Sequence, residues 1–330
     1  MNYLFRILKG ASLAKCSRAL EIVWQRSGKG KCSTLLDMLF CTLRYGAGYH
    51  DYALFGFERL TAAQRDTYVT RIRNKRILDR MNKKEFFDEF NDKTRFLSHF
   101  RQYLGRDVLL LPADSEALTA FLQKHPSFLA KPSRGCGGRG ILHLNKADFP
   151  DESALLQFMT EQKLSILDAP IVQHPHMAAL HPQSVNTLRI VTDRVNGQVY
   201  IAYVLLKIGR GDAFCDNSGQ GGMFCRVNTE TGRVCSAAVD DALEVFEKHP
   251  DTGVSFMGYS IPNFAQALTL AKDASAVIPE IGHIGWDVAI TPSSAVIVEG
   301  NADPGVMCQF YPLWKDEDGL WRFYQHILGL

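Results

Sequence analysis

Hydrophobic residues in the first ninety positions recur at the spacing of an amphipathic helix. One such run ends before Gly46 and Gly48, which favour helix termination, and its members are Leu35, Leu36, Leu39, Phe40 and Leu43. A second amphipathic turn follows at Phe86, Phe87 and Phe90. The spacing predicts that residues 1–90 are mainly helical, and we expect both stripes to face a hydrophobic core.

Beyond residue 92, helical patterns alternate with short apolar runs that are typical of strands. Helices are predicted over Thr94–Leu104, Glu116–Lys124, Ser153–Gln162 and Phe264–Ala274, with Asp92 and Ser115 as N-caps of the first two. Strands are predicted over Val108–Leu111, Ile171–His176, Leu188–Asp193, Val199–Ile208, Phe224–Val227 and Val234–Val239. The dipeptide Asn196-Gly197 is a strong signal for a type I′ hairpin turn. Helices mixed with hairpins favour an α+β fold with antiparallel sheets.

A glycine-rich segment lies between two strand-like runs, Phe128–Lys131 and Ile141–Leu144. It contains Arg134, Gly135, Gly137, Gly138, Arg139 and Gly140. Its G-x-G-x-x-G spacing precedes a strand rather than a helix, which argues against a dinucleotide-binding turn, and it lacks the Gly-Lys-Ser/Thr of a P-loop. Glycine backbones let N–H groups approach phosphate oxygens closely. We interpret the segment as a phosphate-binding flap, and the alternative is a glycine-rich surface turn.

Another hairpin is predicted near the C-terminus, where Gly285–Ile290 and Val296–Asn301 flank a turn cluster. Side chains two apart on a strand share a face, so Glu299 and Asn301 project together, and Asp287 on the partner strand can face them. Carboxylate and amide oxygens are the ligands that Mg²⁺ prefers. The pattern therefore favours a magnesium site, and the alternative is an ordinary hairpin with acids at its ends.

Together, the flap and the C-terminal hairpin resemble the ATP-grasp superfamily, in which a lysine-preceded glycine flap covers the triphosphate and a late Asp … Glu-x-Asn set holds magnesium. Further segments resemble other parts of that pattern: Asn91–Lys93, Ile171–His176, Ser184–Thr192 and Asp216–Gly222. The segments Ser184–Thr192 and Asp216–Gly222, together with Cys41 and Tyr45–Tyr49, are similar to one branch of the superfamily. That branch is the sugar-transfer-associated ATP-grasp proteins, which are related to α-L-glutamate ligases.

The resemblance implies roles for named residues. The implied nucleotide-binding residues are Lys93, Lys131, Arg134, Gly135, Gly137, Gly138, Gly140, Gln173, His174 and His176. The implied metal ligands are Asp287, Glu299 and Asn301, and the implied catalytic residues are Arg189, Lys207, Arg210 and Asn217. The implied cofactors are ATP and Mg²⁺, with Mn²⁺ as an alternative ion. Alternation of Arg189 with Leu188 and Ile190 predicts that its side chain lies on the strand face opposite the core.

The implied activity is that of a carbon–nitrogen ligase. ATP would phosphorylate a carboxylate, and an amine would displace phosphate to give an amide, with ADP and phosphate as the other products. The partners would be a small carboxylate and a small amine, one of them sugar-linked if the branch name reflects a role in polysaccharide biosynthesis. Two alternatives stay open: a small-molecule kinase with the same nucleotide site, and a nucleotide-dependent scaffold of a glycan assembly system.

The expected organisation is a helical region over residues 1–92 followed by an ATP-grasp domain over 93–330. Within that domain, residues 93–175 would form a small lobe that carries the flap, and residues 176–330 a large lobe that binds the metal and the acceptor. His174, His176, His181 and His283 are possible proton acceptors, and each is more often a packed or surface histidine.

Composition fits a cytoplasmic enzyme. Of 330 residues, 46% are hydrophobic and 22% charged, and no apolar run approaches the ~20 residues that span a bilayer. The N-terminus lacks the apolar region and cleavage site of a signal peptide. None of the eight cysteines forms a C-x-x-C pair, which argues against structural zinc and for a reducing compartment. Cys136, between flap glycines and near arginines, is either a reactive thiol or an incidental residue.

Charge is distributed unevenly along the chain. The net charge is +2, but residues 1–100 contain 19 Lys and Arg against 10 Asp and Glu, whereas the remainder contains 18 against 25. A basic N-terminal half can meet an anionic substrate or a membrane surface, and the alternative is a solvated helix surface. No DNA- or RNA-binding motif is recognisable, so we expect no nucleic-acid partner.

Overall fold

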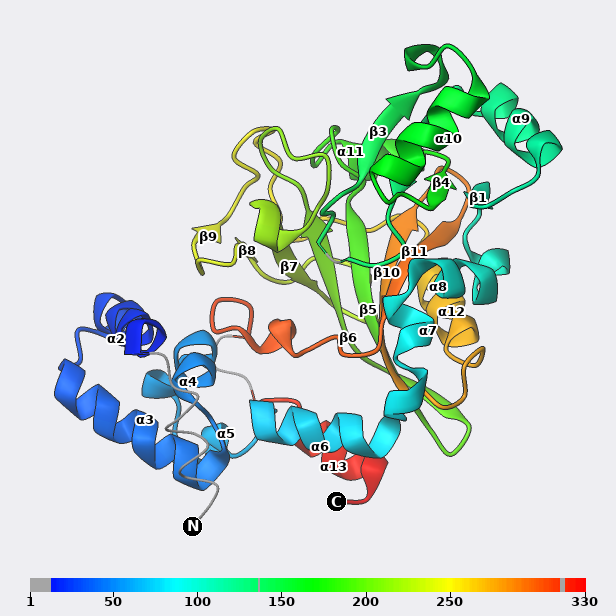
Figure 1. Ribbon diagram of the computed structural model, residues 1–330. Helices are drawn as coiled ribbons and strands as arrows, with labels where there is room; N and C mark the ends of the chain where they lie inside the picture. Colours follow the sequence, from blue (N-terminus) through cyan, green and yellow to red (C-terminus); the bar gives the residue numbers. More distant parts are fainter. Residues whose placement is uncertain (1–12, 136, 315–317) are drawn as a thin grey trace. The chain divides into compact units, whose positions relative to one another are not determined.

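The computed structural model describes residues 13–135, 137–314 and 318–330, and it divides the chain into two compact units. The first unit combines Met1–Arg80 with Gly305–Leu330, and the second is Met81–Pro304 (Figure 1). The boundary predicted at residues 92 and 93 differs from this division, because it assigns the C-terminal segment to the ATP-grasp domain. None of the described helices is both long and apolar enough to cross a membrane.

The first unit is helical, as the spacing of its apolar residues predicts. Its helices are α2 (Leu13–Ser27), α3 (Lys31–Tyr45), α4 (Tyr49–Phe55), α5 (Ala62–Arg65), α6 (Arg71–Met81) and α13 (Trp321–Leu328), with short 3₁₀ turns at Phe57–Arg59 and Met307–Gln309. Aromatic side chains form its core: Phe57 lies 5.6 Å from Tyr68 and 6.0 Å from Tyr52, ring centre to ring centre. Packing of this kind stabilises helices that are too short to persist alone.

The orientation of α3 is the reverse of the predicted one. Its five large apolar residues at 35, 36, 39, 40 and 43 are exposed, whereas Thr34, Met38, Cys41 and Tyr45 are buried. The buried side is fixed by Asp37, whose carboxylate accepts hydrogen bonds from Tyr52 at 2.6 Å and from Arg65 at 2.7 Å. The expectation that this stripe faces a core was wrong, because periodicity identifies an apolar face without identifying what covers it.

Within the second unit, a four-stranded antiparallel sheet forms the small lobe, in the order β1-β4-β2-β3. Its strands are β1 (Val108–Leu110), β2 (Ser127–Lys131), β3 (Leu142–Asn145) and β4 (Ile166–Asp168). Helices α9 (Ser115–Lys124) and α10 (Glu152–Glu161) pack on one face through Phe121, Leu155 and Met159 (Figure 1). The alternating side chains Lys131 and Asp168 belong to the other face.

A seven-stranded antiparallel sheet forms the large lobe, in the order β11-β10-β5-β6-β7-β8-β9. Its strands are β5 (Thr187–Val195), β6 (Gln198–Ile208), β7 (Met223–Val227), β8 (Ala238–Val239), β9 (Val245–Phe246), β10 (His283–Ile290) and β11 (Ala295–Asn301). Helix α12 (Phe264–Ala274) packs on this sheet through Ala267, Ala271 and Ala274. Asn196 and Gly197 both have positive φ, which agrees with the predicted type I′ turn.

A short helical segment adds to the large-lobe core. It comprises α7 (Asp88–Asn91), α8 (Lys93–His99) and 3₁₀ turns at Lys84–Phe86 and Arg101–Tyr103. Phe90 and Phe100 pack on Trp286 of β10, with the ring of Phe100 5.2 Å from it. Asp92 caps α8 by accepting from the Thr94 N–H at 3.0 Å, as predicted. This cap places Lys93 at the first position of α8.

Three local predictions need correction. Ile171–His176 is not a strand: β4 ends at Asp168, and a short helix, α11 (Pro175–Ala178), follows. Proline at 170 and 175 removes two N–H donors from that stretch, which disfavours strand pairing. The cap of α9 is Asp114, which accepts from the Ala117 N–H at 2.7 Å, one residue before the predicted Ser115. Only Ala238–Val239 of the strand predicted over Val234–Val239 is regular, and Val234 forms an isolated bridge.

Candidate active site

The C-terminal hairpin brings the two predicted metal carboxylates together. In the register of β10 and β11, Asp287 pairs with Glu299 and Gly285 pairs with Asn301, and a bulge follows directly after Asp287. On its other side, Asp287 pairs with Arg189 of β5. Paired residues on adjacent strands have Cβ atoms roughly 4.5–5.5 Å apart, so all three side chains share one face of the sheet.

An ion cluster occupies this face of the sheet. The Arg189 guanidinium donates to both carboxylate oxygens of Asp287, at 2.6 and 3.0 Å. Lys207 of β6 donates to the same carboxylate at 3.0 Å and lies 3.3 Å from a carboxylate oxygen of Asp216. Asp216 in turn accepts from the Thr187 N–H at 2.9 Å. Arg189 and Lys207, which were predicted as catalytic residues, therefore both lie beside the predicted metal site.

The cluster shifts its members' pKa values in different directions. Burial alone would raise the pKa of Asp287, but the charges of Arg189 and Lys207 outweigh it and hold that pKa well below its usual range. Burial alone would lower the pKa values of Arg189 and Lys207, but the neighbouring carboxylates raise both. Crowding by protein, followed by the charge of Asp287, raises the pKa of Glu299, and the exposure of its side chain to solvent moderates that rise.

The donor chemistry of the hairpin fits a magnesium ion. Among the described residues, none donates a hydrogen bond to the Glu299 carboxylate, which leaves its oxygens available to a cation. Asn301 supplies an amide oxygen, which accepts from the Asp303 N–H at 2.9 Å. In the described part of the chain, no group of three or more His, Cys, Asp or Glu side chains is placed to hold a metal ion, so the hairpin would offer the ion two carboxylates and an amide. Such incomplete protein coordination is typical of Mg²⁺ bound together with phosphates.

The glycine segment between β2 and β3 forms a hairpin loop, as predicted for the flap. Gly135, Gly137, Gly138 and Gly140 all have positive φ, a conformation that side chains with a Cβ rarely adopt. The Lys93 ammonium donates to the Gly135 carbonyl, and the Lys93 N–H donates to the Ser133 carbonyl at 2.7 Å. Cys136, flagged from the sequence, lies outside the described residues. Lys93 and the flap backbone are thus brought together at the start of α8.

The tip of the flap contacts the loop that carries Asn217. The Gln220 side chain donates to the Gly137 carbonyl. A Cβ at Gly138 would lie 3.1 Å from Cys215 Sγ and 3.1 Å from Gln220 Nε2, so the two loops approach closely. Asn217 caps its own turn by accepting from the Gly219 N–H at 2.8 Å. The flap and the loop Asp216–Gly222 therefore lie against each other.

Lys131 lies at the end of β2 in a second buried network. Its ammonium pairs with Asp168, and the same carboxylate accepts from Arg106. Arg106 also donates to the carbonyl of Ile297 on β11 at 2.8 Å, so it joins the small sheet to the strand that carries Glu299. Burial alone would raise the pKa of Asp168, but Lys131 and Arg106 lower it. Lys131 thus has a carboxylate partner that a phosphate group would have to share or replace.

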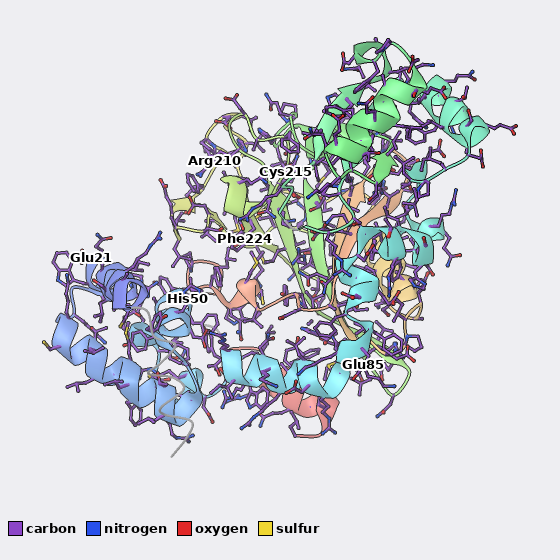
Figure 2. All side chains as sticks on the ribbon, in the orientation of Figure 1. Glu21, His50, Glu85, Arg210, Cys215 and Phe224 are labelled. Carbon is purple, nitrogen blue, oxygen red and sulfur yellow. The ribbon has the colours of Figure 1, made fainter. Side chains whose placement is uncertain are left out.

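Other predicted residues have partners away from the ion cluster. Arg134 pairs with Asp88 at 3.1 Å on an exposed surface. Arg210, labelled in Figure 2, lies 3.4 Å from Asp240, and its guanidinium stacks over the Phe246 ring. Neither arginine is brought to Asp287 in the structure.

Ile171–His176 lies between β4 of the small lobe and β5 of the large lobe, and its polar side chains make contacts within the protein. Gln173 donates to the Ser184 carbonyl at 2.6 Å and accepts from the Asn186 N–H at 3.1 Å. His174 caps α11 by accepting from the His176 N–H at 3.0 Å. The His176 ring stacks on Tyr259 with centres 4.4 Å apart. The backbone takes part as well, since the His174 N–H donates to the Ile290 carbonyl at 2.7 Å, so the segment is held by contacts within the protein.

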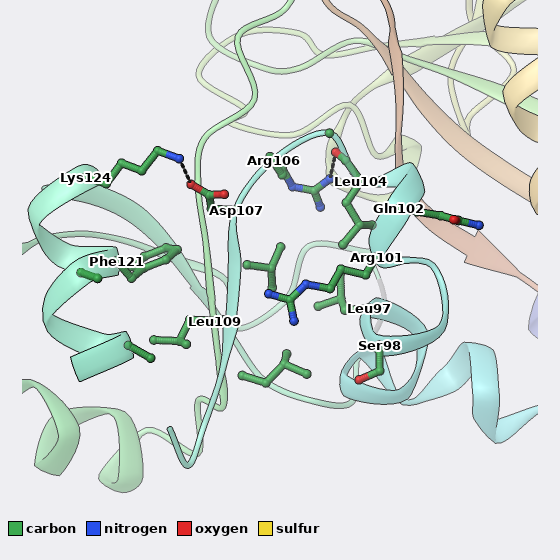
Figure 3. A pocket seen from close by; sticks show the side chains of 15 residues that line it. Leu97, Ser98, Arg101, Gln102, Leu104, Arg106, Asp107, Leu109, Phe121 and Lys124 are labelled. Atoms are coloured by element: carbon green, nitrogen blue, oxygen red, sulfur yellow. Dashed lines mark hydrogen bonds and ion pairs between the residues drawn. The ribbon is translucent and has the colours of Figure 1, made fainter. Parts of the chain in front are cut away.

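A cavity of about 590 Å³ lies beside β1, and Arg106 of the Lys131–Asp168 network is among its lining residues (Figure 3). It is lined by Leu97, Arg101, Leu109, Phe121 and Lys124 among others, and none of the predicted site residues belongs to its lining. Lys124 pairs with Asp107 at 2.6 Å at its edge. We therefore assign the candidate active site to the ion cluster and the flap, not to this cavity.

Sequence reasoning missed three charged members of the two networks: Arg106, Asp168 and Asp216. Asp168 ends a short apolar run, where an acid on a buried strand is a signal for a partner cation. Asp216 stands in a loop that the family pattern includes, but its bond to Thr187 follows only from the fold. Arg106 follows a glycine and carries no motif, so nothing in the sequence distinguishes it from a surface arginine.

Comparison with known families decides the classification. A family model described as sugar-transfer associated ATP-grasp matches residues 72–312. This chain belongs to that family. The ATP-grasp fold predicted from the flap and the C-terminal hairpin is therefore confirmed, together with the helical region that precedes it.

Solved structures are similar to this ATP-grasp chain only at a distance. An N5-carboxyaminoimidazole ribonucleotide synthetase with ADP is 12% identical, with a TM-score of 0.43 over 73% of this chain and 52% of that chain. An L-amino acid ligase from Bacillus licheniformis is 11% identical, with a TM-score of 0.42 over 74% of this chain and 49% of that chain. The ATP-grasp ligase PsnB with its minimal precursor is 11% identical, with a TM-score of 0.43 over 76% of this chain and 64% of that chain.

The ATP-grasp chain thus spans about half the length of the first of these proteins. A comparison with curated proteins found no match.

Proposed function

We propose that this protein is an ATP-dependent carboxylate–amine ligase that forms an amide through an acyl-phosphate. The observation that carries the proposal is the paired arrangement of Asp287 and Glu299 beside two buried cations, Arg189 and Lys207. This arrangement combines a metal-binding pair with groups that can neutralise a transferring phosphoryl group. Membership of the ATP-grasp family supports the same assignment.

The nucleotide would lie between the flap and the ion cluster. Lys131 and Lys93 are the proposed contacts to its α- and β-phosphates, and the glycine backbone of the flap would supply N–H donors to the same oxygens. Burial and the charge of Asp287 raise the pKa of Glu299, and the charges of Lys207, Arg189 and Lys93 partly oppose that rise, which agrees with a position of Lys93 near the metal carboxylates. Asp287, Glu299 and Asn301 would hold Mg²⁺, which would neutralise phosphate charge, and Mn²⁺ has the same preference for oxygen ligands.

The proposed reaction has two steps. In the first, a substrate carboxylate oxygen attacks the γ-phosphorus, the bond to the β-phosphate oxygen breaks, and ADP leaves. In the second, an amine attacks the acyl carbon, the bond to phosphate breaks, and the amine loses a proton, giving an amide and inorganic phosphate. Arg189 and Lys207 would stabilise the transferred group in both steps, and positioning with electrostatics supplies most of the acceleration without a covalent nucleophile.

The proposal identifies the two substrates by chemical class, as a carboxylate and an amine. The loop from Asp216 to Gly222, which contacts the flap, is the proposed entrance for the acceptor. A sugar-linked carboxylate or amine would agree with the family's name, and a role in polysaccharide biosynthesis would follow from it. We place the reaction in the cytoplasm, where ATP and Mg²⁺ are both supplied.

The test is a panel of carboxylates and amines incubated with the full chain, ATP and Mg²⁺. The proposal predicts equal amounts of ADP and phosphate, an amide detected by mass spectrometry, and a hydroxamate when hydroxylamine replaces the amine. AMP and pyrophosphate would contradict it. ADP with a stable phosphorylated product would instead assign the protein as a small-molecule kinase. ATP binding without turnover of any substrate pair would favour the nucleotide-dependent scaffold.

A further inference from the structure

The exposed side of α3 forms an apolar face with no cover in the described chain. Leu36 and Leu43 are 69% and 65% exposed, and Leu35, Leu39 and Phe40 are between 40% and 53% exposed. At ~100° per residue, these five side chains fall within a sector of about 140°, and the buried residues of α3 occupy the opposite side. Isolated exposed leucines are ordinary, but four leucines and a phenylalanine that adjoin on a single face mark an interaction surface.

Cations stand at both ends of this face. Lys29 and Lys31 precede its first leucine, and Arg44 follows its last. The one acid of α3, Asp37, is on the other side of the helix and is paired with Arg65. The apolar face therefore has a basic border, where Lys31 pairs with Glu21 of α2 at 2.7 Å, and α3 itself adds no acid to it.

The surrounding unit has an excess of positive charge. Residues 13–80 contain 13 Lys and Arg against 6 Asp and Glu. Five of these acids are neutralised by ion pairs: Glu21–Lys31, Asp37–Arg65, Glu58–Arg26, Asp66–Arg73 and Asp79–Lys75. Glu21 is labelled on α2 in Figure 2. After these five pairs, eight of the 13 cations remain against one acid, the buried Asp51, and this excess of positive charge attracts an anionic surface.

Trp24 of α2 extends the apolar face with an aromatic side chain. It is 47% exposed, and the Lys31 ammonium lies 5.3 Å from the centre of its ring. The other tryptophans, Trp286, Trp314 and Trp321, are buried. An exposed indole with a nearby cation is typical of the boundary between lipid tails and headgroups.

We propose that this face, Trp24 with the exposed residues of α3, docks on an anionic lipid bilayer. The helix lies in the plane of the interface, its leucines and Phe40 enter the boundary of the acyl chains, and Lys29, Lys31 and Arg44 contact lipid phosphates. With 15 residues, α3 is ~22 Å long, too short to span a bilayer, so it lies on the surface.

Charge favours a bilayer over a second copy of this chain. A two-fold contact that brought two α3 helices together in antiparallel orientation would set Lys29 and Lys31 of one copy against Arg44 of the other. Those like charges would repel each other, and the one acid beside them, Glu21, offsets only the charge of Lys31. A bilayer with mobile anionic headgroups can pair with the cations at both ends of α3 at once.

The experiment is sedimentation of the full chain with vesicles of phosphatidylcholine, alone or mixed with phosphatidylglycerol. The wild-type chain is expected to bind the mixed vesicles at least ~10-fold more tightly than the neutral ones. Leu36→Glu/Leu43→Glu should weaken that binding by ~10-fold or more, because two charges replace apolar side chains in the interface. The matched control is Met257→Glu/Val245→Glu, which alters exposed apolar residues of the second unit and should bind like wild type.

A second measurement uses the wild-type fold. Brominated phosphatidylcholine in the mixed vesicles should quench tryptophan fluorescence, and Trp24→Phe should remove most of that quenching. Absence of wild-type binding to mixed vesicles, equal binding by the Leu36→Glu/Leu43→Glu chain, or unchanged quenching in the Trp24→Phe chain would overturn the proposal. Self-association without vesicle binding, abolished by Leu36→Glu/Leu43→Glu, would overturn it in favour of a dimer.

Discussion

Asp287 and Glu299 are paired across β10 and β11, yet their pKa values shift in opposite directions, down for Asp287 and up for Glu299. Asp287 has two cations beside it, and Glu299 has none within hydrogen-bonding distance among the described residues. A divalent cation between them would satisfy the carboxylate that the protein leaves without a partner. This asymmetry leads to the first prediction.

Without metal, Glu299→Gln should be more stable than wild type, and the difference should depend on pH. Because the folded state raises the pKa of Glu299, its ionised form opposes folding; the cost is absent below its ordinary pKa of 4.5 and grows as pH rises through the raised value. Urea unfolding across that interval in the presence of a chelator measures the difference. Identical pH dependence in the two chains would contradict the assigned environment of Glu299.

Asp168→Asn should destabilise the protein by about 3–5 kcal/mol, because it leaves Lys131 and Arg106 without a counter-charge in a buried position. Lys131→Met is the matched variant. It keeps the Arg106–Asp168 pair and should cost less stability, while it weakens ATP binding by about 1.5–3 kcal/mol through the lost phosphate contact. Denaturant titration and calorimetry separate the two effects, and an Asp168→Asn chain as stable as wild type would contradict the network.

Gly138→Ala should weaken nucleotide binding while the protein stays folded. Its φ is +74°, and the added Cβ would crowd Cys215 and Gln220, so the flap tip cannot keep its place against the acceptor loop. Gly211→Ala is the control, since Gly211 has a φ of +62° and open space around it. Both variants carry backbone strain of ~1–2 kcal/mol. Equal nucleotide affinities in the two variants would show that the crowding has no effect on the site.

Hydrogen exchange should slow in residues 137–141 when an ATP analogue and Mg²⁺ are added. Consecutive glycines lower the local stability of the flap, and binding would offset the cost of ordering it. Strand β7 (Met223–Val227) is buried in the large sheet and should exchange slowly in both states. A flap that exchanges at the same rate with and without nucleotide would indicate a rigid turn.

The features that could be predicted from the sequence are those that depend on residues close together along the chain. The spacing of Asp287, Glu299 and Asn301 on two short strands was enough to place them on one hairpin, and the glycine segment was enough to place the flap between two strands. Arg189 alternates with the core residues Leu188 and Ile190, and strand alternation therefore places its side chain on the face that carries the ion cluster.

Contacts between distant segments could not be predicted in the same way. Asp216 reaches Lys207 and Asp168 reaches Lys131 only because the sheets bring them together. Arg134 and Arg210 have motif-like positions but pair with acids elsewhere in the fold. For α3, periodicity gave the helix, whereas a polar contact of Asp37 with Arg65 decided which side is buried.

The central claim is that Asp287 and Glu299 bind Mg²⁺ with a nucleoside triphosphate beneath the flap. Calorimetric titration of a non-hydrolysable ATP analogue tests it directly, with wild type and Glu299→Gln, each with and without Mg²⁺. We expect wild-type affinity to fall by ~10-fold or more when Mg²⁺ is withheld, since the phosphates then lose their charge-neutralising ion. Glu299→Gln should bind with the weaker affinity whether or not Mg²⁺ is present. Equal Mg²⁺ dependence in both chains, or no binding by wild type, would contradict the claim.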